Sequence, residues 1–369
     1  MQELLKALHS PKLSQALLQQ VIELADTFTA RYGRKPVFME VCGSHTMALA
    51  RTGLKNRLKH HVTLVSGPGC PVCVTDQQSI DSMIALAEDE NRIICTFGDM
   101  MRVPGSQKTL MGARTEGKDV RVVYSPTDAI TIAMQHPDRE VIFLGIGFET
   151  TIPILAVVLK EAQERGLSNI SMWVSTKLLE PILRHLLDSG EVKIDGFLLP
   201  GHVSIVLGAA QYQFLTDEYG ISGVISGFEP LQMVSSLYRL LELTIKGKVE
   251  IINDLTSIVG ERGNKVAQQL METYFTPCDE EWRGIGTIPS SGLAIREEYR
   301  HLDAKHKFDV PNIKPRRTQC RCGEVIRGVI APPECRLFGL ACTPVQPIGP
   351  CMVSAEGTCA AYYAYTRED

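Results

Sequence analysis

A repeating order of apolar and polar segments begins at residue 36. Each repeat has a short β-branched apolar run, a turn rich in Gly, Ser or Thr, and then a segment with apolar residues at helical spacing. Strands alternating with helices in this way indicate βαβ units and parallel sheets covered on both faces. The predicted strands are 37–41, 62–65, 92–95, 120–124, 141–146, 171–174, 196–199 and 224–225, and the clearest predicted helices are 79–87, 152–162, 178–187 and 231–243.

The predicted domains follow from interruptions of this order. Apolar residues at helical spacing between Leu17 and Phe28 predict an N-terminal helix that ends at Gly33. A polar stretch at 108–119 divides the strands, so we expect an α/β fold of two Rossmann-like domains with parallel sheets. The predicted ranges are 1–118 for the helix and first α/β domain, 119–249 for the second, and 250–369 for a small C-terminal domain organised around a metal.

Composition narrows the class of protein. The 369 residues carry 38 Lys and Arg against 42 Asp and Glu, a formal net charge of −4, which argues against a nucleic-acid binder or a polybasic membrane patch. No apolar run approaches the roughly 18–20 residues needed to span a bilayer. The first twenty residues lack the pattern of a secretory signal. We therefore expect a cytoplasmic protein with neither a nucleic-acid nor a membrane partner.

The eleven cysteines are distributed unevenly. Four lie in the first hundred residues, Cys278 stands alone, and six crowd the last fifty. In a reducing compartment such cysteines are metal ligands or redox thiols more often than structural disulfides. The distribution predicts two thiol centres joined by a body without thiols.

The first centre combines Cys42 with the pair Cys70 and Cys73. Cys42 ends a predicted strand and His45 lies one turn into the following helix, a setting that lowers the pKa of a thiol and suits a nucleophile or a soft ligand for iron. Cys70 and Cys73, in Gly67-Pro-Gly-Cys-Pro-Val-Cys73, can close a disulfide or share a metal, and the next helix favours their thiolates. Half a zinc knuckle, or plain buried cysteines, is the structural alternative.

The second centre is the tail after residue 319. Fourteen residues separate Cys320 from Cys335, six separate Cys335 from Cys342, and sixteen separate Cys342 from Cys359. Four dispersed thiolates in a Pro- and Gly-rich frame suit an iron–sulfur cluster, although structural zinc would also be satisfied by four thiolates. The other two tail cysteines, at 322 and 351, would then be spare thiols near the cluster or could exchange into ligation.

Polar residues follow other predicted strands. Glu149 stands after strand 141–146, where a carboxylate can orient a thiol, a histidine or a ligand, or simply favour a helix N-terminus. Asp99 and His202 are similar cases, and we expect all three on one sheet edge. Neither a P-loop nor a Gly-x-Gly-x-x-Gly motif follows any strand, which argues against a nucleotide site.

The motifs together resemble the HypD family of hydrogenase maturation proteins, over nearly the whole chain. The resemblance is carried by Glu40-Val-Cys-Gly-Ser-His45, by the Gly67–Cys73 motif and by the tail spacing that ends in Cys351-Met-Val-Ser-Ala-Glu-Gly-Thr-Cys359. Gly147-Phe-Glu-Thr-Thr151 and Pro200-Gly-His-Val-Ser204 add to it. The motifs occur in the family's order.

The resemblance implies a scaffold and electron-transfer protein for the Fe(CN)2CO group of [NiFe] hydrogenases. It implies that Cys42 holds a mononuclear iron with CN and CO ligands, shared with a HypC-type small chaperone. Cyanide would come from HypE, working with HypF, and the hydrogenase large subunit would be an indirect partner. Cys70 and Cys73 would be a redox pair, and Cys320, Cys335, Cys342 and Cys359 would hold a [4Fe–4S] cluster in the C-terminal domain.

Two other functions stay open at this point. A stand-alone [4Fe–4S]-dependent thiol–disulfide oxidoreductase would use the tail and Cys70 with Cys73, but it leaves Cys42 and His45 unexplained. A zinc-stabilised binding module would have no redox function. The sequence does not decide whether a scaffold that is loaded once per client turns over as an enzyme.

Overall fold

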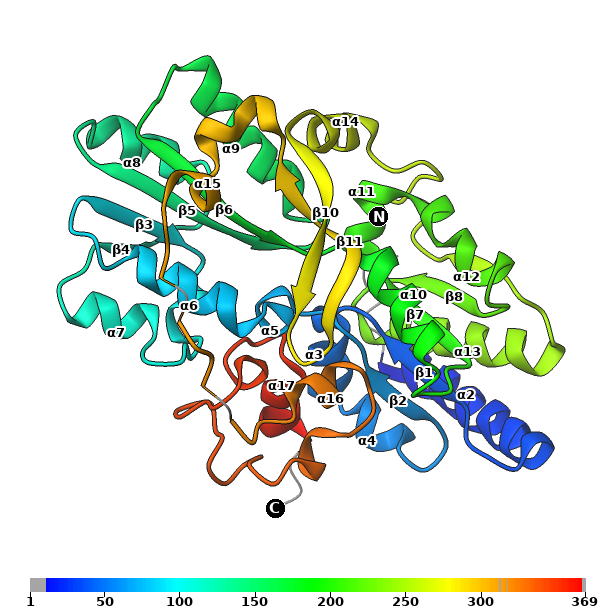
Figure 1. The fold of residues 1–369 in the computed structure, drawn as a ribbon. Coiled ribbons are helices and arrows are strands. Elements are labelled where there is room, and N and C mark those ends of the chain that lie inside the picture. Colours follow the sequence, from blue (N-terminus) through cyan, green and yellow to red (C-terminus); the bar gives the residue numbers. More distant parts are fainter. Residues whose placement is uncertain (1–10, 312, 317, 367–369) are drawn as a thin grey trace.

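The computed structural model describes residues 11–366 apart from 312 and 317. Within these residues the chain forms a five-stranded parallel sheet, a four-stranded parallel sheet and one antiparallel pair (Figure 1). The five-stranded sheet has the order β2-β1-β7-β8-β9, with bounds Thr63–Ser66, Val37–Glu40, Gly196–Pro200, Ser222–Ser226 and Ile251–Asn253. The four-stranded sheet has the order β4-β3-β5-β6, with bounds Val120–Val122, Arg92–Thr96, Glu140–Gly147 and Ile170–Thr176.

Helices cover both sheets, as expected for βαβ units. The longer ones are α2 (Pro11–Tyr32), α3 (Gly43–Arg51), α6 (Gln77–Leu86), α8 (Asp128–Gln135), α9 (Ile152–Glu164), α10 (Leu179–Ser189), α13 (Pro230–Lys246), α14 (Lys265–Tyr274) and α17 (Thr358–Tyr365). The shorter ones are α4 (Leu54–Leu58), α5 (Pro71–Val74), α7 (Leu110–Thr115), α11 (Gly201–Leu207), α12 (Gln213–Asp217), α15 (Ala304–Lys307) and α16 (Cys322–Ile326). All eight predicted strands and the predicted helices are confirmed.

The N-terminal helix shows how local signals and packing agree. Val21, Ala25 and Phe28 are buried on one face of α2, as the helical spacing predicts. The helix packs against α13 and the five-stranded sheet. It ends where Gly33 adopts a left-handed φ of 69° and its N–H donates to the carbonyl of Thr29.

The two sheets do not follow the predicted ranges 1–118 and 119–249. Strand β3, from the first range, lies in the four-stranded sheet, whereas β7 and β8, from the second, lie beside β1. The chain thus leaves the five-stranded sheet after β2, builds the whole four-stranded sheet, and returns. Parallel strands are joined by long crossovers, so consecutive strands can enter different sheets without any change in the local sequence pattern.

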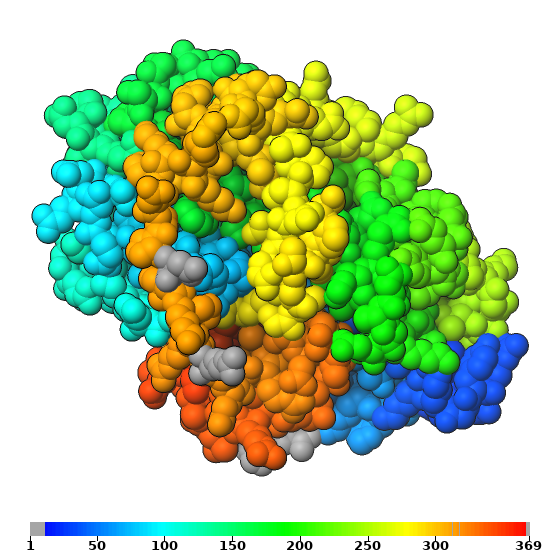
Figure 2. Space-filling view, viewed as in Figure 1, coloured from blue at the N-terminus to red at the C-terminus, as the bar shows by residue number. Residues whose placement is uncertain are grey.

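Residues 250–366 are spread over the molecule. Strand β9 completes the five-stranded sheet, and the antiparallel hairpin β10 (Phe275–Trp282) and β11 (Gly286–Ile295) packs on β6 and α10. Figure 2 shows this hairpin, in yellow, at the surface in the middle of the face viewed. One apolar core joins Met39 of β1, Ile142 of β5 and Val353 of the cysteine tail. The tail therefore packs on both sheets rather than around a core of its own.

Neither the hairpin nor β9 was predicted, because β9 is only three residues long and the hairpin strands lack a clean alternation of apolar and polar positions. Among the described residues no helix is both long and apolar enough to cross a membrane.

Candidate functional site

The loops at the carboxyl end of the five-stranded sheet bring the predicted motifs together. Cys42 follows β1 as the N-cap of α3. After β2, Cys70 is the N-cap of α5 and Cys73 lies within α5. His202 follows β7, and Phe228 follows β8. The Phe228 ring lies 4.6 Å from the ring of His45 and 4.5 Å from that of His202, measured between centroids. Loops distant in sequence thus form one surface around Cys42, at the place where open α/β sheets bind ligands.

The loop before Cys70 lies directly against Cys42. The Gly43 N–H donates to the carbonyl of Gly69 over 3.2 Å. A Cβ atom on Gly69 would stand 2.5 Å from the Cα atom of Cys42, closer than carbon atoms approach without a clash. Only glycine permits this contact, which explains a glycine at this position of the motif.

The thiol of Cys42 differs from the prediction. Burial raises its pKa to about 11, whereas the backbone N–H groups of His45 and Ser44 lower it by less. The sequence argument counted the helix N-terminus and a nearby imidazole but not the loss of hydration. Cys42 is therefore a protonated thiol at neutral pH that must release its proton to bind a metal.

His45 cannot supply the positive charge that the prediction assumed. The side chain is fully buried, and burial lowers its pKa to about 4, so the ring is neutral at neutral pH. Its Nε2 atom lies 3.1 Å from the carbonyl oxygen of Gly227 and donates to it. The Nδ1 atom is buried and has no hydrogen-bond partner among the described residues. His45 therefore fixes the Gly227 loop beside α3.

Cys70 and Cys73 form a disulfide bond. Cys70 is the N-cap of the single-turn helix α5, which starts at Pro71 and contains Cys73, and the Cys73 N–H donates to the sulfur of Cys70. Both cysteines line a small internal cavity together with Cys351 of the tail and Glu356. The disulfide and a tail thiol therefore face the same enclosed space.

The cysteine tail covers this surface from the other side. Ser44, at the start of α3, donates to the carboxylate of Glu356 over 2.7 Å. A Cβ on Gly43 would stand 2.6 Å from the Cβ of Glu356. Ser354 donates to Asp99, which follows β3 of the other sheet. The segment between Cys351 and Cys359 thus joins the Cys42 helix to the four-stranded sheet.

The six tail cysteines form one cluster of half-buried and buried thiols. Cys320 donates to Cys322 and Cys359 donates to Cys351, which raises the pKa of each donor and lowers that of each acceptor. Each pair contains one predicted cluster ligand and one spare thiol. Electrostatic interactions connect these pairs with the remaining two, Cys335 and Cys342.

This donor set fits a [4Fe–4S] cluster. No three His, Cys, Asp or Glu side chains of the described residues are grouped as ligands of one metal ion. A cubane cluster instead takes one thiolate at each iron, so its sulfur ligands surround a body and do not meet at a point. Six neighbouring soft thiols, shielded from water, supply the required four and leave two over.

Glu149 lies elsewhere, contrary to the expectation of one common sheet edge. It follows β5 of the four-stranded sheet and lines a cavity whose walls contain no cysteine. Its Oε1 atom accepts the Leu179 N–H over 2.7 Å, and burial raises its pKa to about 7. The expectation failed because these strands belong to two sheets, each with its own carboxyl edge.

Two residues near the thiols escaped the sequence analysis. Glu356 lies between Cys351 and Cys359 in the tail motif, and this position could have indicated that its carboxylate lies near the thiols. Arg283 carried no signal, yet it donates to the carbonyl of Thr75, just after α5, and interacts electrostatically with Cys320 and Cys322. Both residues reach the site only through tertiary packing.

Comparison with known proteins shows which family the sequence belongs to. Residues 13–366 match the family model described as "HypD: Hydrogenase formation hypA family". The chain is 44% identical over 344 residues to hydrogenase maturation factor HypD2 of Bradyrhizobium diazoefficiens, covering 90% of each chain. It is 43% identical to HypD of Cupriavidus necator over 92% of each chain. It is 39% identical to HypD of Escherichia coli K12 over 98% of this chain and 97% of that one. The chain belongs to the HypD family of hydrogenase maturation factors.

Proposed function

We propose that this protein holds a mononuclear iron at Cys42 while the Fe(CN)2CO group of [NiFe] hydrogenases is assembled on it. The observation that carries the proposal is the convergence of three thiol groups at one sheet edge: Cys42, the Cys70–Cys73 disulfide and the tail. An isolated metal-binding thiol would not require a disulfide packed against its loop. A simple oxidoreductase would not require Cys42.

The iron is the cargo, and Cys42 is its anchor. A low-spin Fe(II) with cyanide and CO ligands is well matched by a soft thiolate. Because the pKa of Cys42 is raised to about 11, iron binding releases a proton from this thiol. The half-buried position of Cys42 limits access of water to the bound iron.

Cys320, Cys335, Cys342 and Cys359 would hold the [4Fe–4S] cluster, which supplies one-electron redox chemistry when bound. Cys351, beside Cys359, lines the same cavity as the Cys70–Cys73 disulfide, so this thiol lies between the two redox groups. Reduction of the disulfide to two thiols consumes two electrons and two protons, and an external one-electron donor protein must supply the electrons. The resulting thiols face Cys42 and its iron across Gly69.

A second protein thiolate would complete the iron site. Cys42 supplies one soft ligand, the disulfide occupies Cys70 and Cys73, and the tail thiols surround the cluster. We infer that a HypC-type chaperone supplies the second ligand at the carboxyl edge of the five-stranded sheet, beside His45. HypE, charged by HypF, would deliver cyanide to this complex, and the hydrogenase large subunit would receive the product.

The test is an infrared and iron analysis of the complex purified anaerobically with a tagged HypC-type partner. The unmodified protein should show cyanide and CO bands and one iron beyond the cluster's four. Cys42→Ser should lose both the bands and the extra iron while the partner still co-purifies, because a stable protein–protein interface buries about 20–30 residues on each side and the variant changes one atom of it. Cys278→Ser, in the hairpin, is the matched control and should keep both.

The same samples separate the alternatives. Retention of the fifth iron after the loss of Cys42 would reject this thiol as the anchor. A complex that contains cluster iron and sulfide but never shows cyanide bands would favour a stand-alone thiol–disulfide oxidoreductase.

A further inference from the structure

A cavity with a volume of about 680 Å³ lies between the hairpin, α10 and α14. This volume falls within the range of small-molecule sites. Its walls are mostly apolar, and Phe275, Ile288 and Leu293 are among the side chains that line it. None of the residues proposed above to hold iron or the cluster lines it, so the cavity is separate from the thiol site.

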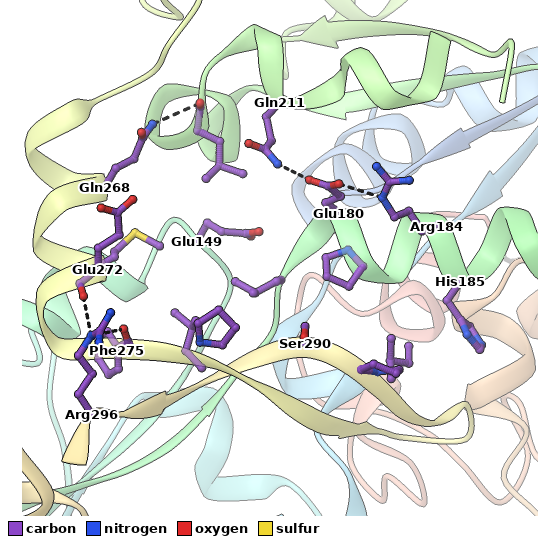
Figure 3. Close-up of a pocket in the computed structure, with 18 of the residues that line it drawn as sticks. Glu149, Glu180, Arg184, His185, Gln211, Gln268, Glu272, Phe275, Ser290 and Arg296 are labelled. Carbon is purple, nitrogen blue, oxygen red and sulfur yellow. Dashed lines mark hydrogen bonds and ion pairs between the residues drawn. The ribbon is translucent and has the colours of Figure 1, made fainter. Parts of the chain in front are cut away.

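A buried carboxyl group with an unused oxygen faces this cavity. Glu149 is 3% exposed, and Figure 3 shows it in the middle of the view, between the two walls. Its Oε1 atom accepts the Leu179 N–H, but Oε2 has no hydrogen-bond partner among the described residues. A buried oxygen left without a partner costs free energy, and native proteins keep few of them. The unused oxygen indicates that something else binds there.

The charges around the cavity favour a cation over an anion. Four carboxyl groups line it against two guanidinium groups. Arg184 is already neutralised by Glu180 and by Glu218, over 2.8 and 2.6 Å. Glu180 also accepts from Gln211, whereas Arg296 donates to the backbone carbonyls of Glu272 and Phe275 (Figure 3). Glu149 is therefore the deepest charge that a ligand can pair with.

We propose that this cavity binds a cationic nitrogen, an ammonium or guanidinium group, carried on an apolar stem. The nitrogen donates to Oε2 of Glu149, and the stem packs against Phe275, Ile288 and Leu293. The positive charge stabilises the ionised carboxyl group, which burial alone disfavours. The same chemistry is offered by a free alkylamine and by a lysine side chain within an apolar peptide segment.

The titratable groups facing Glu149 are few, and they set the pH range of a test. Glu180, Arg184, His185 and Asp188 on α10, Glu272 on α14 and Arg296 after β11 line the cavity with it, and the buried Tyr212 interacts with it electrostatically. The pKa of Glu149, raised to about 7, means that the carboxyl group is increasingly protonated below neutrality and loses its attraction for a cation. Measurements at pH 8 therefore favour binding.

The experiment titrates the full-length protein with four probes by calorimetry at pH 8. The free probes are n-hexylammonium and its uncharged analogue n-hexanol. The peptide probes are Ac-Leu-Leu-Lys-NH2 and the same peptide with norleucine in place of lysine. In at least one pair the cation should bind about tenfold or more tightly than its neutral analogue. A stronger preference in the peptide pair identifies a protein-borne lysine, and one in the hexyl pair identifies a free amine.

Two variants complete the test. Glu149→Gln keeps the size of the side chain but removes its charge, and should bring cation and neutral analogue to within about twofold of each other. Glu272→Gln, at the exposed rim, is the matched control and should keep most of the preference. Equal binding of cation and neutral analogue in both pairs, or a preference that survives Glu149→Gln, would overturn the proposal.

Discussion

The triplet Gly-Phe-Glu occurs at the carboxyl end of both sheets: at 147–149, where Gly147 is the last residue of β5, and at 227–229, directly after β8. In the five-stranded sheet, Phe228 lies between two histidine rings and Glu229 begins α13 in a capping box with Gln232. In the four-stranded sheet, Phe148 packs in the core near Trp282 and Glu149 faces a cavity. The same residues therefore serve different chemistry.

The difference comes from what covers each edge. The cysteine tail covers the edge of the five-stranded sheet, where Glu356 and Cys351 reach the Cys42 helix and the disulfide. The hairpin β10–β11 covers the edge of the four-stranded sheet and leaves room beneath it. A strand–turn–helix motif sets the backbone of such an edge, whereas segments distant in sequence decide whether it becomes a thiol site or a cavity.

The largest effect should come from removing the Cys42 thiol at the carboxyl edge of the five-stranded sheet. Cys42→Ala should abolish hydrogenase maturation, because no other free thiol stands at the start of α3. It should leave tail-bound iron and sulfide unchanged, because the tail cysteines are separate ligands. Hydrogenase activity in cells and iron and sulfide analysis measure the two effects. Cys278→Ala is the control for the loss of a thiol, and loss of the cluster in Cys42→Ala would contradict two separate centres.

The two phenylalanines compare the edges directly. Phe148→Ala should lower the free energy of unfolding by about 3–5 kcal/mol, because it empties a buried site beside Trp282. Phe228→Ala should cost only about 1 kcal/mol, because its half-buried ring loses two ring contacts. Urea unfolding of both variants measures the difference. Similar losses would mean that the Phe228 loop is as much part of the core as the Phe148 loop.

The sequence was sufficient for local structure and for grouping the thiols by segment. The predicted strands and helices were found in place, with ends shifted by up to three residues, because apolar runs and helical spacing are local signals. The convergence of Cys42 with Cys70 and Cys73 also followed, since their segments come after the neighbouring parallel strands β1 and β2 of one sheet. The assignment of strands to the two sheets could not be predicted, because the sequence of a βαβ crossover does not indicate which sheet the next strand joins.

Electrostatics was the weaker part of the prediction. For Cys42 the sequence predicts a position at a helix N-terminus, which lowers the pKa of a thiol. Burial of the thiol by the tail and by Gly69 raises the pKa by more, and this effect is not visible in the local sequence. For Glu149 the helix-start reading missed the hairpin that closes over it. In both cases solvent is excluded by segments distant in the chain, the cysteine tail for Cys42 and the hairpin for Glu149.

The carboxyl group of Glu149, at the carboxyl edge of the four-stranded sheet, should make the free energy of unfolding depend on pH. The pKa of Glu149 is raised by burial from 4.5 to about 7, so its contribution to stability is fully present below about pH 4.5 and is lost as pH rises through 7. Glu149→Gln has no such dependence. Relative to the unmodified protein, the variant should gain about 2 kcal/mol between pH 5.5 and pH 8, measured by urea unfolding. A constant difference across this range would mean that Glu149 is not desolvated.

Glu229→Gln, at the carboxyl edge of the five-stranded sheet, is the control for the effect of Glu149→Gln on stability. It replaces the same residue type in the same triplet, but at a helix start, and should cost at most about 1 kcal/mol.

The smallest effect concerns the link between the tail and Cys42. The carboxylate of Glu356 raises the pKa of Cys42, although burial contributes more. Glu356→Gln removes this charge and keeps an oxygen that can accept from Ser44. The thiolate fraction of Cys42 at pH 8 should therefore rise, and alkylation by iodoacetamide should become about two- to threefold faster. Mass spectrometry of the Cys42 peptide follows the rate, with Glu88→Gln on the exposed surface as the control. If the reaction slows instead, the tail shields Cys42 through packing that the glutamine disturbs, and the charge of Glu356 has no measurable part in setting its reactivity.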